Sequence, residues 1–173
     1  MMRDFDIAIL AFSLIGSLLA FLRYNFSPAK IFMGDTGSLL VGMILSVLAI
    51  KLIKSGIVIG NVNFPNKGPL FAIVFLAIPL FDTLRVFIVR SSKGLGPLSA
   101  GRDHIHHALL DLGFGHKRVS ISLYLLSIFL ILISFFLCQF NINLGIATLA
   151  LVAYSILIIP FYFLRKKNEK MKK

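Results

Sequence analysis

Long apolar segments alternate with short polar connections along the whole chain. A helix that crosses a bilayer needs about 20 apolar residues. The last three segments reach that length alone, and the first two reach it when their flanking residues are included. The segments are too long, and alternate too little, for membrane strands. The pattern therefore predicts an all-α fold, a polytopic membrane helical bundle of about five transmembrane helices in a single region over residues 1–173. The five segments are Ile7–Leu22, Leu39–Ile53, Leu70–Val89, Ser120–Phe140 and Leu144–Leu164.

Composition supports a membrane protein and argues against a nucleic-acid-binding protein. Hydrophobic residues make up 58% of the chain and charged residues 14%, whereas a soluble domain is about 45–50% apolar. The net charge of +11 would suggest nucleic acid in a soluble protein. Basic residues beside membrane spans are what topology requires, so we expect no nucleic-acid partner.

The distribution of basic residues predicts the orientation in the membrane. Thirteen of the 18 Lys and Arg residues lie in three places: the connections Arg23–Gly37 and Arg90–Arg118, and the tail from Arg165. The opposite connections hold four. The positive-inside rule places the richer set in the cytoplasm and the amino terminus outside. Residues 165–173 then form a basic cytoplasmic tail at the anionic leaflet, and both polar stretches described next lie on one face.

The stretch "FMGDTGSLL" has the residue types of a phosphate and metal site. Gly34 and Gly37 allow the backbone to turn tightly and approach a ligand. Thr36 or Ser38 is expected to cap the following helix, leaving N–H groups free at its start. Asp35 is the one carboxylate in this connection, and Mg²⁺ often binds one or two carboxylates plus substrate phosphates. The alternative is that Asp35 is itself the helix N-cap.

The stretch "GRDHIHHALLDLGFGHKR" gathers most of the histidines. His104 and His107 are three residues apart and can share a helical face, whereas His106 should point elsewhere. Zinc sites usually add Cys, Asp or Glu at characteristic spacings, and these histidines lie outside the apolar segments, where haem ligands would be expected. Arg102 beside the imidazoles favours phosphate or pyrophosphate binding and proton transfer. The alternative is a solvated loop, and His116 is expected to be a surface residue.

Two further sets of charges have two interpretations each. Asp82 and Arg85 lie three residues apart inside the third apolar segment, where ionisable residues are costly and usually functional. They either serve function or form an internal ion pair that orients the helix. Arg23 and Lys30 either contact phosphates or anchor the first segment at the membrane surface.

Two motifs in this order carry a family resemblance. "NFSPAKIFMGDTGSLLVG", followed one hairpin later by "RDHIHHALLDLGFGHKRV", resembles the carboxyl-terminal half of polyprenyl-phosphate N-acetylhexosamine-1-phosphate transferases. These Mg²⁺-dependent enzymes of the bacterial inner (cytoplasmic) membrane move a sugar-1-phosphate from a UDP-sugar to undecaprenyl phosphate. The reaction releases UMP and begins cell-envelope polysaccharide or lipid-linked glycan synthesis. The resemblance implies a cytoplasmic active face, a polyprenyl phosphate and a UDP-sugar as substrates, and allows a homodimer.

The resemblance also assigns roles to residues. The His-Ile-His-His form resembles the N-acetylglucosamine branch, which implies UDP-N-acetylglucosamine or a related UDP-hexosamine as donor. Asp35 matches the family position that contributes to the Mg²⁺ site. The catalytic residues so implied are Asp35, His104, His106 and His107, and the substrate-binding residues are Arg102, Lys30, Asn25, Gly34 and Gly37.

The chain departs from the family pattern at two points. Many members have Asp where this chain has Gly101, and here an Asp stands at 103 instead. The paired aspartates of the family have no counterpart in this chain, since they lie upstream of the shared motifs. We therefore expect a partner-dependent half of an enzyme, with an inactive truncated membrane remnant as the alternative. A transporter using Asp35, Asp82 and Arg85 would need glycine-broken repeats in mid-membrane, which the sequence lacks.

Overall fold

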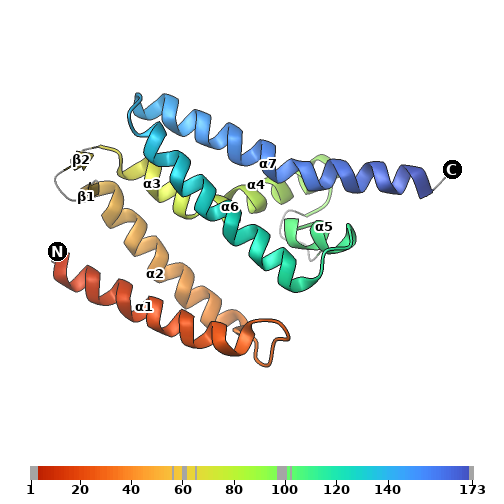
Figure 1. Ribbon diagram of the computed structural model, residues 1–173, viewed down its shortest axis with the longest axis horizontal. Coiled ribbons are helices and arrows are strands. Elements are labelled where there is room, and N and C mark those ends of the chain that lie inside the picture. Colours follow the sequence, from red (N-terminus) through yellow and green to blue (C-terminus); the bar gives the residue numbers. More distant parts are fainter. Residues whose placement is uncertain are drawn as a thin grey trace. The chain divides into compact units, whose positions relative to one another are not determined.

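The computed structural model describes residues 4–55, 57–59, 62–64, 66–96, 101 and 103–171. Over these residues the chain forms helices and one short β-hairpin (Figure 1). Two compact units, Met1–Gly68 and Pro69–Lys173, are described separately below. The elements are α1 (Asp4–Asn25), α2 (Gly34–Ser55), β1 (Ile57–Ile59), β2 (Val62–Phe64), α3 (Gly68–Phe75), α4 (Ala77–Ser92), α5 (Ile105–Asp111), α6 (His116–Leu137) and α7 (Ile142–Met171).

All five predicted apolar segments are helical, and the predicted fold class is confirmed. Among the described residues, α1, α2, α6 and α7 are long and apolar enough to cross a membrane. The pair α3 and α4 adds a fifth span if it is counted as one bent segment. The antiparallel hairpin is an addition to the prediction; it pairs Ile57 with Phe64 and Ile59 with Val62.

The third apolar segment is bent rather than straight. The sequence predicted one helix over Leu70–Val89, but α3 and α4 meet at 72° on either side of Leu76. Pro79 explains the break, because its ring would clash with the carbonyl of Phe75 in a continuous helix and it has no N–H to donate. It is tolerated in the first turn of α4, where N–H groups have no intrahelical acceptor.

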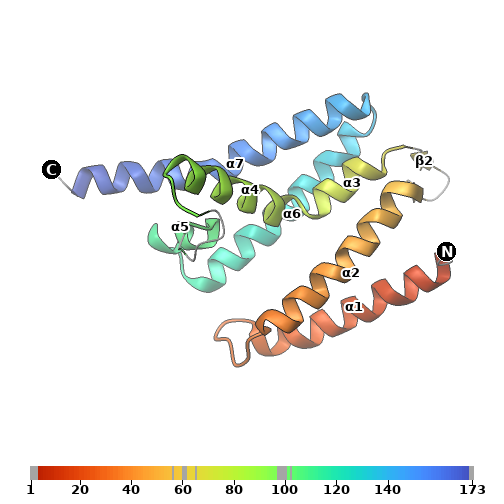
Figure 2. The ribbon, with the colours of Figure 1, turned by 180° about the vertical axis from the view of Figure 1, so that it is seen from behind.

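The first unit is an antiparallel helical pair with a thin core (Figure 2). Leu14 is 8% exposed, whereas Phe12 is 72% and Leu39 is 74% exposed. Apolar surface on this scale is not stable in water. It suits contact with lipid or with other membrane helices, where packing rather than water drives association.

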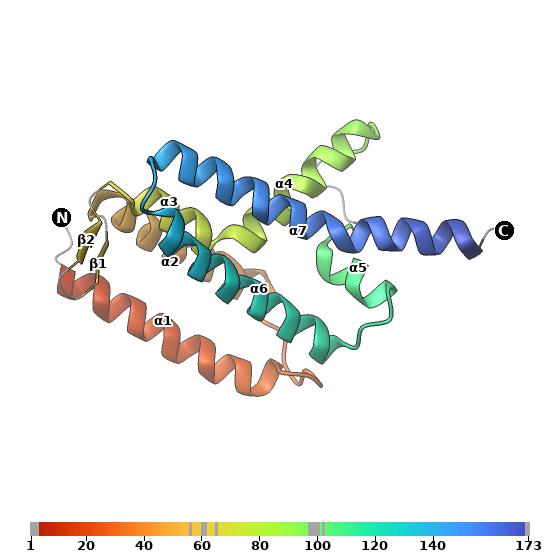
Figure 3. The ribbon, with the colours of Figure 1, turned by 45° about the horizontal axis from the view of Figure 1, so that its top comes forward.

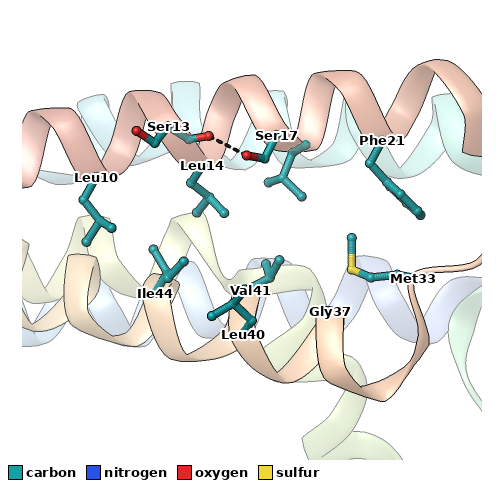
Figure 4. A pocket seen from close by; sticks show the side chains of 11 residues that line it. Leu10, Ser13, Leu14, Ser17, Phe21, Met33, Gly37, Leu40, Val41 and Ile44 are labelled. Carbon is teal, nitrogen blue, oxygen red and sulfur yellow. Dashed lines mark hydrogen bonds between the residues drawn. The ribbon is translucent and has the colours of Figure 1, made fainter.

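A groove of about 220 Å³ runs between α1 and α2 (Figure 4). Leu10 and Ile44 line one end, and Phe21 and Met33 line the other. The hydroxyl of Ser17 on its wall donates to the Ser13 carbonyl at 2.8 Å. The groove is therefore apolar apart from Ser13 and Ser17, and the Ser17 hydroxyl is already hydrogen-bonded.

The second unit has a packed core built around α7. Helices α4, α5 and α6 all contact α7, and α6 lies antiparallel beside it (Figure 1). Leu70, Phe71, Leu130, Leu149 and Leu157 are at most 1% exposed. This core fixes α4 and α5, which carry most of the candidate site, against one helix.

Helix α7 continues well past the thickness of a bilayer. Its 30 residues span about 45 Å, whereas the hydrocarbon core of a membrane is about 30 Å thick. The second half of α7 lies beside α5 (Figure 3). There the Lys167 ammonium donates to the Asp111 carbonyl at 2.9 Å. The long carboxyl-terminal helix therefore supports the histidine segment, which is the stretch from Asp103 to Asp111 that carries His104, His106 and His107.

Candidate active site

The histidine segment is partly helical. The sequence placed these histidines in a connection between apolar segments, with a solvated loop as the alternative. In the structure α5 begins directly after His104, whose backbone is extended (φ −75°, ψ 153°). Ile105, Ala108 and Leu109 are buried on the side that meets α6 and α7. Apolar residues at i, i+3 and i+4 are the pattern of an amphipathic helix, so the signal for α5 was present in the sequence.

The three predicted histidines form one cluster. The ring centroids of His104 and His106 lie 5.9 Å apart and stacked, with an interplanar angle of 10°. Those of His106 and His107 lie 4.1 Å apart and tilted by 41°. The prediction that His106 points away from the other two is wrong. His104 precedes the helix, so its side chain does not follow helical periodicity, and this brings its ring back to His106.

The cluster favours a neutral His106. Partial burial, followed by the neighbouring imidazoles of His107 and His104, lowers the pKa of His106 below its ordinary value, because each disfavours a further positive charge. His107 adds a buried Nδ1 with no hydrogen-bond partner among the described atoms. At neutral pH the His106 ring therefore offers a lone pair and an N–H group rather than a fixed positive charge. His116 is exposed, as predicted.

Asp82 on α4 holds the start of the histidine segment. Its carboxylate is buried, at 8% exposed. One oxygen, Oδ2, lies 2.9 Å from His104 Nδ1, and the other accepts the Ile105 N–H at 3.0 Å. Asp82 thus satisfies a free N–H at the start of α5, which a capping side chain would usually do.

Arg85 and Arg90 on the same helix hold the preceding residue. Arg85 donates to the Asp103 carbonyl oxygen at 2.7 Å, and its guanidinium lies 3.2 Å from the centre of the Phe161 ring. Arg90, only 5% exposed, donates to Asp103 Oδ2 at 2.9 Å. Asp82 and Arg85 therefore position the histidine segment, instead of serving only as an ion pair within α4. Sequence reasoning predicted no contact between Arg90 and Asp103, which are 13 residues apart.

Steric crowding explains why position 101 is a glycine in this chain. A Cβ at this position would lie 2.6 Å from Arg90 Nη2 and 2.8 Å from Asp103 Oδ2, closer than real side chains approach one another. The backbone therefore passes directly over the Arg90–Asp103 pair. Arg102, a predicted substrate-binding residue, lies outside the described residues.

The second candidate stretch, in the first unit, leaves a carboxylate exposed. Helix α2 begins at Gly34, which has a left-handed φ of 66° that favours glycine. Asp35 lies in its first turn, and Ser38 donates to the Asp35 carbonyl at 3.0 Å. Because the helix starts before all three residues, the predictions that Asp35, Thr36 or Ser38 caps it are wrong.

Asp35 suits a shared rather than a self-sufficient metal site. Its side chain is exposed. Across the described residues, no group of three or more His, Cys, Asp or Glu side chains is placed to hold a metal by itself. Mg²⁺ commonly binds one or two carboxylates and completes its shell with phosphate oxygens and water, so this carboxylate fits one ligand position.

The remaining predicted residues surround the connection between α1 and α2. The Asn25 amide donates to the Ile31 carbonyl at 2.9 Å, and the Lys30 N–H donates to the Tyr24 carbonyl at 2.8 Å. Asn25 thus folds the connection back onto α1, while the Lys30 side chain is exposed. Gly37 lies against Met33 at the end of the apolar groove. The expectation that these residues share a face with the histidines stays a prediction, because the two units are described separately.

Comparisons with known proteins agree with the motifs. The model of glycosyl transferase family 4 matches residues 1–53. A decaprenyl-phosphate N-acetylglucosaminephosphotransferase of Mycolicibacterium smegmatis is 37% identical over 122 residues, covering 68% of this chain and 30% of the relative. A probable undecaprenyl-phosphate N-acetylglucosaminyl 1-phosphate transferase of Bacillus subtilis is 39% identical, covering 69% and 32%.

A third relative comes from the muramoyl branch. It is a phospho-N-acetylmuramoyl-pentapeptide-transferase of Clostridium beijerinckii, 36% identical, covering 68% of this chain and 32% of the relative. No solved structure matches the chain. Over about two thirds of its length the chain is therefore related to polyprenyl-phosphate N-acetylhexosamine-1-phosphate transferases, and it spans about 30% of the length of these relatives.

Proposed function

We propose that this chain supplies part of the active site of a membrane enzyme that transfers N-acetylhexosamine-1-phosphate from a UDP-sugar to a polyprenyl phosphate. The observation that carries the proposal is the cluster of His104, His106 and His107, held in place by the buried Asp82 of α4. Transferases with such names match this chain over about two thirds of its length. The exposed Asp35 supplies the second element of the site.

In the proposed reaction an oxygen of the lipid phosphate attacks the sugar-side phosphorus of the donor. The bond between that phosphorus and the bridging oxygen breaks, and UMP leaves with the bridging oxygen. Phosphoryl transfer depends mainly on positioning and on stabilising the charge of the phosphates. A neutral His106 and its neighbours can donate to phosphate oxygens, and Lys30 can contact them as a point charge.

Asp35 would hold the metal in this scheme. When bound there, Mg²⁺ would neutralise charge on the donor pyrophosphate and favour the departure of UMP. The Asp35 carboxylate fits one ligand position, and the donor phosphates fit others. The start of α2 beside it presents backbone N–H groups, which suit a phosphate oxygen.

We propose UDP-N-acetylglucosamine, or a related UDP-hexosamine, as the donor. The names of the Mycolicibacterium and Bacillus relatives favour N-acetylglucosamine, and the His-Ile-His-His form agrees with that branch. We further propose that the chain lies in a bacterial cytoplasmic membrane with both motifs on the cytoplasmic face. The positive-inside distribution of Lys and Arg supports this orientation.

A chimera tests the proposal directly. This chain would replace the matching segment of the Bacillus subtilis relative, and UMP release and sugar transfer to undecaprenyl phosphate would be measured in membrane vesicles. We expect Mg²⁺-dependent transfer that is abolished in Asp35→Ala and in His106→Ala. The unreplaced relative is the control for assay conditions.

Two outcomes would contradict the proposal. Near-normal turnover in both variants would remove the assigned roles. A chimera that reaches the membrane at the level of the parent but transfers no sugar would favour the alternative, a remnant that no longer turns over.

A further inference from the structure

We infer that Asp82 is a positioning residue that fixes the tautomer of His104, with the proton on Nδ1 and the lone pair on Nε2. The inference concerns the proton on one imidazole, and only its catalytic meaning rests on the proposed function. It is carried by the placement of both Asp82 oxygens against successive residues of the histidine segment.

The hydrogen-bond geometry assigns the proton. A carboxylate offers only acceptors, so the 2.9 Å contact between Asp82 Oδ2 and His104 Nδ1 requires that the ring nitrogen donates. A neutral imidazole carries a single N–H, so Nε2 is left as an acceptor. The second oxygen accepts the Ile105 N–H at 3.0 Å, which keeps the carboxylate from rotating away from the ring.

Asp82 and His104 differ in exposure, and the difference suits Asp82 as the residue that positions His104. The Asp82 side chain is 11% exposed and lies on the long helix α4, whereas the His104 side chain is 38% exposed. His104 also precedes α5, so helical hydrogen bonds do not fix its own N–H or its ring. The buried partner is therefore anchored, and the accessible one is oriented by it.

A second contact from α4 strengthens the arrangement. Arg85 lies three residues after Asp82, on the same face of the helix, and donates to the carbonyl of Asp103. Side chains of one helix thus hold residues 103, 104 and 105 in succession. Because the His104 ring stacks on His106, its orientation sets one side of the whole cluster.

The wild-type chain provides the first test. Nitrogen NMR of the ¹⁵N-histidine-labelled 173-residue protein in lipid nanodiscs would be recorded near pH 8, above the ordinary histidine pKa of about 6.5. The His104→Gln variant assigns the signal. We expect a protonated Nδ1 and an unprotonated Nε2 at His104, and the opposite assignment would overturn the inference without any further variant.

The Asp82→Asn variant provides the second test. The amide oxygen can still accept the Ile105 N–H, but the amide NH₂ now faces His104 Nδ1, so the proton should move to Nε2. The matched control is Asp103→Asn, because that carboxylate contacts Arg90 instead of a histidine, and it should leave the His104 tautomer unchanged. An unchanged tautomer in Asp82→Asn would contradict the inference.

Activity separates this inference from the proposed function. In the chimera, Asp82→Asn should lower kcat about tenfold or more at similar KM for the UDP-sugar, with the amount of folded protein unchanged. If the tautomer switches but the parent chimera is inactive, the proposed function fails and the inference stands. If Asp82→Asn loses activity with the tautomer unchanged, the proposed function stands and the inference fails.

Discussion

Arg90 and Asp103 form an ion pair beneath the backbone of Gly101, with Arg90 Nε 2.9 Å from Asp103 Oδ2. The arginine side chain is 6% exposed and the carboxylate side chain 36%. The pair joins the end of α4 to the residue before the histidines. Its half-buried position makes it sensitive both to the loss of a partner and to any side chain added above it.

Removing the carboxylate should destabilise the second unit. In Asp103→Ala a nearly buried guanidinium loses one of its hydrogen-bond acceptors, which typically costs about 1–3 kcal/mol. Asp103→Asn should cost less, since its amide oxygen can still accept from Nε. Thermal unfolding in detergent measures both. Equal stability of Asp103→Ala and wild type would show that the pair contributes nothing.

A side chain at Gly101 should act through the same pair. We expect Gly101→Ala to lower the unfolding free energy by about 1–3 kcal/mol, the usual range for overpacking, because its Cβ displaces Arg90 Nη2. Gly115→Ala, at the N-cap of α6, is the control for adding a methyl group, since a Cβ there meets nothing within 4 Å. In an Arg90→Gln background the effect of Gly101→Ala should shrink, as expected for coupled neighbours. Full additivity of the two changes would contradict this mechanism.

The histidine cluster should show a measurable charge coupling. Removing the neighbouring imidazole in His107→Gln should raise the pKa of His106 toward its ordinary value, because burial and the neighbouring imidazoles now lower it. His116→Gln should raise it less, because His116 contributes least among the causes of the shift. Titration of the His106 ring signals by NMR measures both changes. If the pKa of His106 is unchanged in His107→Gln, the two rings are not coupled electrostatically.

The same shift fixes the sign of a stability effect. The folded state holds the His106 proton more weakly than the unfolded state, whose pKa is near 6.5. The contribution of His106 to the unfolding free energy therefore falls as pH drops through 6.5 and levels off below the folded pKa. In His106→Gln this part of the pH dependence should disappear from thermal unfolding measured between pH 5 and 8.

Hydrophobic pattern was sufficient to find the membrane helices, and local chemistry was sufficient to find the histidines. The bend at Leu76 was missed because the apolar pattern continues through it, although Pro79 carried the signal. The capping predictions at Thr36 and Ser38 failed because a glycine with positive φ begins α2 earlier than side-chain capping rules suggest.

Contacts between residues far apart in the chain could not be predicted from the sequence. Asp82 and His104 are 22 residues apart, and no periodicity links a helix to a segment that folds back onto it. The charge of Asp82 inside an apolar run did indicate a special role. Its partner required the fold, as did the third partner of the segment, Arg90.

The connection between α1 and α2 should depend on one amide. Asn25→Ala removes the hydrogen bond to the Ile31 carbonyl, and we expect a loss of about 0.5–1.5 kcal/mol together with faster proteolysis between residues 26 and 33. Ser46→Ala is the control, because that hydroxyl bonds only within its own helix, to the Gly42 carbonyl. Protease sensitivity equal to the control would show that the amide does not hold this connection.

The end of α7 should support α5 through a single ammonium group. Lys167 donates to the Asp111 carbonyl at the carboxyl end of α5, where a positive charge is favourable to the helix dipole. We expect Lys167→Gln to increase hydrogen exchange of the α5 amides several-fold. A positive charge at the carboxyl end of a helix stabilises it by about 0.3–1 kcal/mol, and the variant would lose this stabilisation. Lys166→Gln, the exposed neighbour, removes the same charge without this contact. If both variants increase exchange equally, net charge of the tail and not the Lys167 contact holds α5 in place.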